Sequence, residues 1–192
     1  MLNLVTSSLS KLSNPKRIHR FCYENVLGTT FELTAFGSSK DAHRACDLAL
    51  AEIDRLESIY SRYKPKSELN RFLLVPIGNS FKVSDDLALL LQSSLDWVKQ
   101  SSGAFHPGVD AYVSLWKQAE KLGELPELTI TEYFQDDFCK LEGNLATRLF
   151  PFSLNFNAIA KGLIVDKALQ AANIFSPQIS INLGGDLSHS GH

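Results

Sequence analysis

A lysine and a glycine at a predicted strand-to-helix junction form the first pattern in this sequence that could do chemistry. The segment Leu154–Ala172 opens with a short apolar stretch that predicts a strand, and apolar residues then recur at helical spacing. Lys161-Gly162 falls in the first turn of that predicted helix. A helix start offers free backbone N–H groups and a positive dipole end, which suit a phosphate. The alternative is an ordinary junction with a solvated lysine.

Two further segments carry side chains that could contact a ligand. In Gly103–Pro107 a glycine and a proline bracket Phe105 and His106, which predicts a loop that presents both side chains in a fixed direction. A lone histidine beside a proline is also commonly a surface or capping residue. Tyr63 lies in the polar loop Ser61–Ser67, where its ring could stack on a flat ligand or cover the edge of the core.

The elements that must position these residues come in blocks without strict alternation. Two helices are predicted from clear apolar faces, one ending near Tyr60 and one capped by Ser84, and a third is expected to stop at Gly123. Strands are predicted within Phe21–Ala35, 145–150 and Ile179–Leu183, whereas 72–81 and 124–142 are expected to be irregular. This arrangement predicts an α+β fold, a mostly antiparallel sheet flanked by helices.

Length, composition and charge limit the possible classes of protein. The 192 residues suit one domain with a real core, and 44% hydrophobic with 21% charged residues indicate a folded globular chain. A net charge of -2 gives no electrostatic case for nucleic acid. The sequence also lacks an apolar run long enough for a transmembrane span.

The first 20 residues are polar and basic, and are predicted to be an N-terminal extension that packs weakly. They do not read as an intact secretory signal, which favours the cytoplasm. A periplasmic or membrane-anchored protein is the alternative if a leader has been removed. Cys22, Cys46 and Cys139 match no metal or redox spacing and are expected to be reduced structural cysteines.

Taken in order, five stretches resemble the ApbE family, the FAD:protein FMN transferases. They are LGTTFEL (Leu27–Leu33), IDRLESIYSRYKPKSELNRF (Ile53–Phe72), SSGAFHPGVDAYVSLW (Ser101–Trp116), LNFNAIAKGLIVDKAL (Leu154–Leu169) and INLGGD (Ile181–Asp186). The resemblance covers residues 24–190. Each stretch alone is a weak signal, but their order and spacing together are specific.

The resemblance implies a fold, a reaction and a place for the ligand. The expected fold is an ApbE-like, T-fold-like flavin transferase. The expected reaction is Mg²⁺-dependent transfer of FMN from FAD to a Ser or Thr hydroxyl of a target protein, with release of AMP. The partners are therefore the flavin dinucleotide and a protein that becomes flavinylated. The flavin is expected in a cleft between the sheet ends and the Ala104–His106 loop.

The resemblance also assigns site residues. Leu27 sits where the family usually has a Met against the flavin, and Tyr63 matches the family's loop aromatic. Gly184-Gly185-Asp186 matches the family's GGD turn. The resemblance implies Mg²⁺ binding by the backbone carbonyl of Ala158, and FAD contacts from Leu27, Tyr63, Ala104, Phe105, His106, Asn155 and Lys161.

Two of these positions depart from the family pattern. His106 and Asn155 both stand where a carboxylate is usual, which removes up to two negative charges from the site. Asn155 keeps an acceptor and gains a donor, so it could bind the same ligand through changed hydrogen bonds. The paired change predicts a subfamily with a retuned site and puts the substrate preference in question.

Length is the larger departure. The family's remaining metal ligands, an Asp and a Thr, and its characteristic His lie beyond the NLGGD block. Residues 21–192 are therefore expected to be the N-terminal part of a transferase domain, with the catalytic residues C-terminal to this chain, and to be unable to complete the reaction alone. The alternatives are an FAD pyrophosphatase, with water as the acceptor, and a non-catalytic flavin-binding module.

Overall fold

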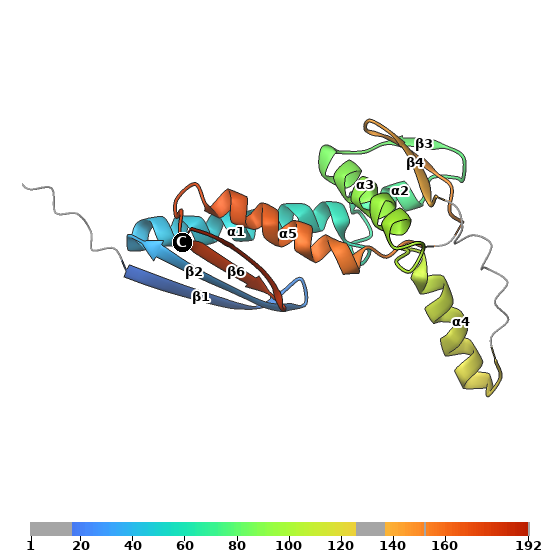
Figure 1. The fold of residues 1–192 in the computed structure, drawn as a ribbon, viewed down its shortest axis with the longest axis horizontal. Coiled ribbons are helices and arrows are strands. Elements are labelled where there is room, and N and C mark those ends of the chain that lie inside the picture. Colours follow the sequence, from blue (N-terminus) through green and yellow to red (C-terminus); the bar gives the residue numbers. More distant parts are fainter. Residues whose placement is uncertain (1–16, 126–136, 152, 192) are drawn as a thin grey trace, which may run out of the picture.

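The computed structural model describes residues 17–125, 137–151 and 153–191 (Figure 1). In chain order the elements are β1 (Arg17–Val26), β2 (Thr29–Gly37), α1 (Ser39–Tyr60), α2 (Glu68–Leu73), β3 (Ser80–Lys82), α3 (Asp85–Gln100), α4 (Val109–Leu122), β4 (Cys139–Glu142), β5 (Leu145–Arg148), α5 (Asn157–Ala172), β6 (Ile179–Leu183) and β7 (Asp186–Ser190). None of the helices within these residues is both long and apolar enough to cross a membrane.

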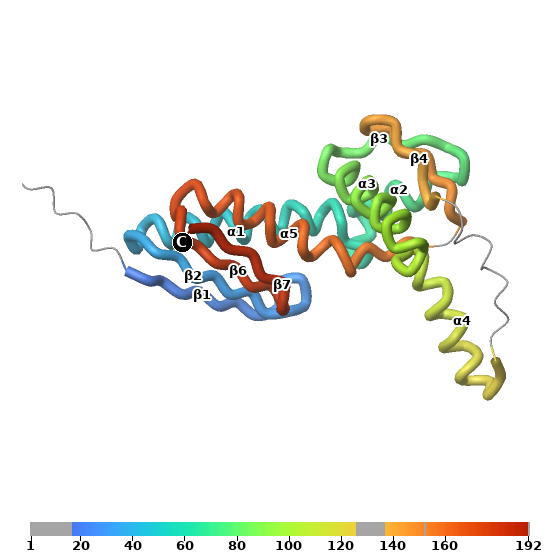
Figure 2. The backbone as a smooth tube through the Cα atoms, viewed as in Figure 1, coloured from blue at the N-terminus to red at the C-terminus, as the bar shows by residue number. Residues whose placement is uncertain are grey.

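The larger sheet has the strand order β1-β2-β6-β7, and every neighbouring pair is antiparallel. Its centre joins strands from opposite ends of the chain, because Leu33 of β2 pairs with Ile181 of β6. Alternate residues of both strands, Phe31 and Leu33 among them, are fully buried on one face. Helices α1 and α5 lie side by side across that face (Figure 2). The predicted α+β fold with an antiparallel sheet is confirmed.

The two long helices are in contact and both bury small residues in the shared core, which allows a close approach. In α1 the buried face includes Ala42, Ala45 and Ala49, and α5 contributes Ala168 and Ala172 to the same core. Helix α1 begins after Ser38, whose hydroxyl accepts a hydrogen bond from the Asp41 N–H. It ends at Tyr60, as its apolar face predicts.

A smaller layer packs at the other end of α1 and α5 (Figure 1). It contains α2, α3 and a second antiparallel sheet in the order β3-β5-β4. Ser84 caps α3 as predicted, with its hydroxyl accepting from the Leu87 N–H. The carboxylate of Glu68 on α2 in turn accepts from both the N–H and the hydroxyl of Ser84, each at 2.6 Å. These bonds fix α2 against the start of α3.

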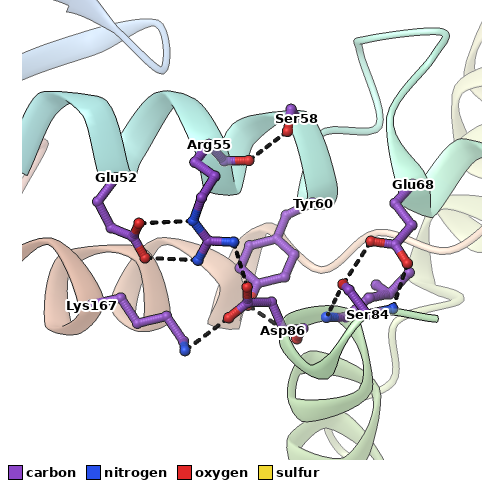
Figure 3. A network of polar contacts seen from close by, with 9 residues as sticks. Glu52, Arg55, Ser58, Tyr60, Glu68, Ser84, Asp86 and Lys167 are labelled. Atoms are coloured by element: carbon purple, nitrogen blue, oxygen red, sulfur yellow. Dashed lines mark hydrogen bonds and ion pairs between the residues drawn. The ribbon is translucent and has the colours of Figure 1, made fainter. Parts of the chain in front are cut away.

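A polar network joins the two layers (Figure 3). The carboxylate of Asp86 on α3 binds Arg55 of α1 at 2.6 Å and Lys167 of α5 at 2.8 Å. Arg55 also pairs with Glu52, and the Tyr60 hydroxyl donates to the Asp86 carbonyl. Desolvation raises the pKa of Asp86, but the bonds from Arg55 and Lys167 more than offset it, so the pKa is lowered overall.

Several short elements differ from the sequence prediction. Strand β1 starts at Arg17, inside the segment predicted to be a weakly packed extension. Helix α2 and strands β3, β4 and β7 were not predicted, although β4 falls at the end of the predicted irregular connection 124–142. Residues 126–136 of that connection lie outside the described part of the chain. The predicted strand at Leu154–Phe156 is wrong, because these residues are irregular although Leu154 and Phe156 are buried.

Strand β5 faces the layer with its small residue. Ala146 is buried, whereas Leu145 and the following Leu149 are 44% and 43% exposed. Arg148 instead directs its guanidinium into the layer and donates to the carbonyls of Leu73 and Val75. A charged side chain is tolerated there because backbone carbonyls satisfy its donors.

Candidate functional site

A cavity of about 470 Å³ lies where three parts of the larger layer meet. They are the β1–β2 turn, the end of α1 with the loop after it, and the first half of α5. The lining residues are Leu27, Gly28, Thr29, Glu57, Tyr60, Ser61, Arg62, Tyr63, Asn157, Ala160, Lys161 and Ile164. Three of the residues predicted for the site, Leu27, Tyr63 and Lys161, therefore converge on one cavity from distant parts of the sequence.

The β1–β2 turn presents Leu27 in a strained conformation. Leu27 and Gly28 connect the paired residues Val26 and Thr29, with φ angles of 51° and 74°. A two-residue hairpin turn with both φ angles positive favours Asn-Gly, and a branched side chain at the first position is unfavourable. Strain of this kind is characteristic of functional sites. The side chain of Leu27 is half-buried and forms part of the cavity wall.

Replacing Leu27 by Asn is expected to change stability and ligand binding in opposite directions. Asn tolerates the left-handed region, so the free energy of unfolding should rise by about 0.5–1 kcal/mol. Loss of the apolar wall should weaken binding of a ring-containing ligand several-fold. Thermal unfolding and ligand titration measure the two effects. The matched control Leu27→Ala should weaken binding without the gain in stability, and a less stable Leu27→Asn variant would contradict the strain argument.

The loop after α1 holds Tyr63 at the cavity edge. The amide of Asn70 on α2 donates to the carbonyls of Arg62 and Lys64 at 2.9 and 2.8 Å, which fixes the loop backbone from below. The Arg62 guanidinium lies 5.4 Å from the centre of the Tyr63 ring. The ring itself is 74% exposed, so it is available to stack on a flat ligand.

Lys161 provides a cation on the α5 wall. Its ammonium pairs with Asp186 at 3.1 Å, and both side chains are about 40% exposed. A pair this exposed is weak enough for an anionic ligand to displace the carboxylate. Across the cavity, Glu57 is paired with Lys64 at 2.5 Å. Lys161 is the fifth residue of α5 and therefore lies in the second turn of the helix, not in the predicted first turn.

The backbone start of α5 is mostly occupied by the protein itself. The Asn157 N–H donates to the Asn155 side chain, and the N–H groups of Ile159 and Ala160 donate to the Phe156 carbonyl. The predicted use of these free N–H groups for a phosphate therefore lacks support in the geometry. The Lys161 side chain is the better anchor for an anion.

The turn Gly184-Gly185-Asp186 packs against Thr29, which lines the cavity. Gly184 has a φ of 59°, and a Cβ on it would lie 2.5 Å from the Thr29 hydroxyl. Only glycine fits both the left-handed backbone and this close approach. The turn then places Asp186 beside Lys161.

The Ala104–His106 loop lies outside the residues that line the cavity. Ala104 is exposed, and Phe105 is half-buried with its N–H donating to the Ser101 hydroxyl. His106 is 5% exposed, so of the surface or capping alternatives the surface one does not hold. Its Nδ1 accepts from the Gly108 N–H at 2.9 Å, so the neutral ring carries its proton on Nε2. This differs from the predicted cleft, which had this loop as a wall.

Asn155 is likewise absent from the cavity lining, and its side chain is bound to protein. Its Nδ2 donates to Asp110 at 3.0 Å, and its Oδ1 accepts from the Asn157 N–H. Asp110 also pairs with Arg62, which does line the cavity. Sequence reasoning missed both Arg62 and Asp110, although Arg62 is next to Tyr63.

The described residues offer no further metal ligands beside the predicted magnesium ligand, the Ala158 carbonyl. Ala158 lies in the first turn of α5, is exposed and does not line the cavity. Within residues 17–125, 137–151 and 153–191, no group of three or more His, Cys, Asp or Glu side chains could hold a metal ion. One carbonyl does not fit the octahedral coordination of Mg²⁺. The described residues therefore do not form a magnesium site by themselves.

The titratable groups near the core favour binding over nucleophilic chemistry. Burial raises the pKa of Tyr60, which lines the cavity, so its phenol stays neutral at physiological pH. Burial also raises the pKa of Cys46 to about 11 and that of Cys139 to about 12, which makes both poor nucleophiles. All three cysteines are free, as predicted, and Cys22 is exposed.

Comparison with known proteins gives a consistent result. The model of the ApbE family matches residues 27–192. An FAD:protein FMN transferase of Chlamydia pneumoniae is 27% identical over 175 residues, covering 85% of this chain and 55% of that protein. The apo flavinyl transferase ApbE of Pseudomonas stutzeri matches with a TM-score of 0.74 and 18% identity over 92% of this chain and 62% of its own.

The flavin transferase ApbE of Vibrio cholerae also matches, with a TM-score of 0.74 and 19% identity over 92% of this chain and 60% of that chain. At this level of identity the solved structures support the fold. The chain spans 55% of the curated relative's length, so the activity of the whole relative does not transfer to it directly.

Proposed function

The chain belongs to the ApbE family, and on that premise we propose that it binds FAD in the cavity and takes part in FMN transfer. The acceptor is a Ser or Thr hydroxyl of a target protein, and AMP is released. The observation that carries the proposal is the convergence of Leu27, Tyr63 and Lys161 on one cavity.

The cavity suits the parts of a flavin dinucleotide. Its volume lies within the ordinary range of ligand sites, about 300–1,000 Å³. Leu27 and Ile164 offer apolar surface, and the exposed Tyr63 ring offers a stacking face for the isoalloxazine or adenine ring. Lys161 offers a charge-assisted hydrogen bond to a phosphate oxygen. In this proposal the chain binds and orients the dinucleotide.

The proposed reaction is a phosphoryl transfer. The acceptor hydroxyl oxygen attacks the phosphorus on the FMN side of the pyrophosphate and loses its proton, and the P–O bond to the AMP phosphate breaks. A new phosphoester joins FMN to the protein, and AMP leaves with the bridging oxygen. The Lys161 ammonium would stabilise the negative charge of the pyrophosphate oxygens electrostatically during this step.

The proposal includes magnesium dependence, and only the resemblance to the family supports that part. Since the described residues offer only the Ala158 carbonyl, no step of the reaction is assigned to a protein-bound metal. Chelation with EDTA should abolish transfer if the dependence holds, and titration of FAD with and without Mg²⁺ separates a role in binding from a role in chemistry.

The deciding experiment incubates the purified chain with FAD and Mg²⁺, with and without a target protein carrying the acceptor Ser or Thr. Transfer gives an FMN adduct on the target by mass spectrometry and an equal amount of AMP. AMP and free FMN without a target would instead indicate an FAD pyrophosphatase. Tight FAD binding with no AMP would support the binding half of the proposal, as expected for the N-terminal part of a transferase domain or for a flavin-binding module. The absence of FAD binding would overturn the proposal altogether.

A further inference from the structure

Asp110, the second residue of α4, is bound to two elements that the proposed function needs in place. Its carboxylate pairs with Arg62 from the loop after α1 and accepts from the Asn155 amide, two residues before α5. The Asp110 side chain is only 20% exposed. The carboxylate thus links two separate segments, and we call the contacts among Arg62, Asp110 and Asn155 the joint.

Asn155 can take part in this joint only as an amide. Its Nδ2 donates to Asp110, its Oδ1 accepts from the Asn157 N–H at 2.9 Å, and its own N–H donates to the Pro107 carbonyl at 2.7 Å. A carboxylate at position 155 could accept but not donate, and it would face the carboxylate of Asp110. The two residues are therefore matched as donor and acceptor.

Arg62 is the member of the joint that lines the cavity. Its guanidinium binds Asp110 and lies 5.4 Å from the centre of the Tyr63 ring, so the ion pair and the cation–π contact restrain the same side chain. Arg62 and Asn157 both line the cavity, whereas Asp110 and Asn155 do not. The joint thus connects two cavity walls from outside the space that a ligand would fill.

We propose that Asp110 is a positioning residue that holds the Arg62–Tyr63 loop and the N-terminus of α5 at a fixed separation. With the proposed function as its premise, this separation sets the affinity for FAD. The positioning itself does not depend on the identity of the ligand and can be tested without it.

The test compares Asp110→Ala, Asn155→Asp and the exchanged pair Asp110→Asn/Asn155→Asp in the full chain. Amide hydrogen exchange over residues 61–66 and 155–160 reports positioning, and flavin fluorescence titration reports FAD affinity. Each single variant should speed exchange in both segments and weaken FAD binding about tenfold. The exchanged pair restores one donor and one carboxylate, and should recover most of both losses. Glu120→Gln, at an exposed position of α4, is the control and should change neither.

The outcomes separate this inference from the proposed function. Faster exchange in both segments, with recovery in the exchanged pair, supports the joint even if the wild-type chain fails to bind FAD. Unchanged exchange in Asp110→Ala overturns it. Faster exchange with wild-type FAD affinity overturns the link from the joint to the ligand and leaves the proposed function standing.

Discussion

Replacing Lys161 by Met should weaken FAD binding by about 30-fold, the largest effect on affinity expected from one side chain in the cavity. A hydrogen bond to a charged group contributes about 1.5–3 kcal/mol, which corresponds to roughly 10- to 100-fold in affinity. The exposed partner Asp186 does not prevent this, because a surface pair is worth at most about 1 kcal/mol. Met keeps the length of the apolar stem, so packing against the cavity wall is retained.

Flavin fluorescence titration of the wild type and Lys161→Met measures this effect directly. Lys140→Met is the matched control, since Lys140 is a 64% exposed lysine on β4 that pairs with Glu142. Its loss should leave FAD affinity unchanged. If Lys161→Met binds FAD within twofold of the wild type, the phosphate anchor is not Lys161 and the proposed orientation of the dinucleotide fails.

Replacing Asp86 by Asn should lower the free energy of unfolding by about 2 kcal/mol at neutral pH. The change removes two charge-assisted bonds at once, to Arg55 and to Lys167. Each bond joins α3 to a different helix, so α1 and α5 both lose a charge-assisted link to α3, while the Tyr60 hydroxyl of α1 keeps its bond to the carbonyl of residue 86. The expected loss is moderated because Arg55 is 46% exposed and keeps its pair with Glu52.

The stabilisation by Asp86 should decrease as the pH falls. The pKa of Asp86 is lower in the folded protein than in the unfolded chain, so its contribution is complete above the unfolded value of about 4. It is lost as the pH falls through the lowered folded value. Urea unfolding at several pH values should therefore show the wild type and Asp86→Asn converging below about pH 4.

Asp85→Asn is the control for this series. Asp85 shares the first turn of α3 and its dipole, but its carboxylate accepts from the amide of Asn144 rather than from a cation. Its replacement should cost less than about 1 kcal/mol. Equal losses in the two variants would assign the effect to the helix dipole rather than to the network.

The long helices and the buried strand could be predicted because one local pattern determines each of them. Apolar periodicity defined α1 and α3, Ser84 marked the start of α3, and β6 is an apolar run before two glycines. Strand β7 has no such pattern, since it is a polar strand at a sheet edge whose position depends on pairing with β6. Helix α2 has only six residues, too few for a periodic signal.

The candidate site was predictable in the same uneven way. Of the seven FAD contacts that the resemblance to the family implies, Leu27, Tyr63 and Lys161 line one cavity, whereas Asn155 and the Ala104–His106 loop do not. Whether they contact FAD stays a prediction. Local sequence could not reveal the joint at Asp110, because its two partners lie about 45 residues away on either side. Such long-range pairs leave no periodic trace in a single sequence.

Because β6 pairs with β2, the central pairing of the larger sheet forms only after most of the chain has been synthesised. The paired residues Glu32 and Asn182 are 150 positions apart, and the amide of Asn182 donates to the Glu32 carboxylate at 2.9 Å in the finished sheet. A ribosome that adds roughly 5–20 residues per second needs on the order of 10–30 s to cover that distance. During this time the nascent β1–β2 hairpin has an open edge, which can pair with other chains. The carboxylate of Glu32 on that edge discourages such pairing until its partner strand emerges.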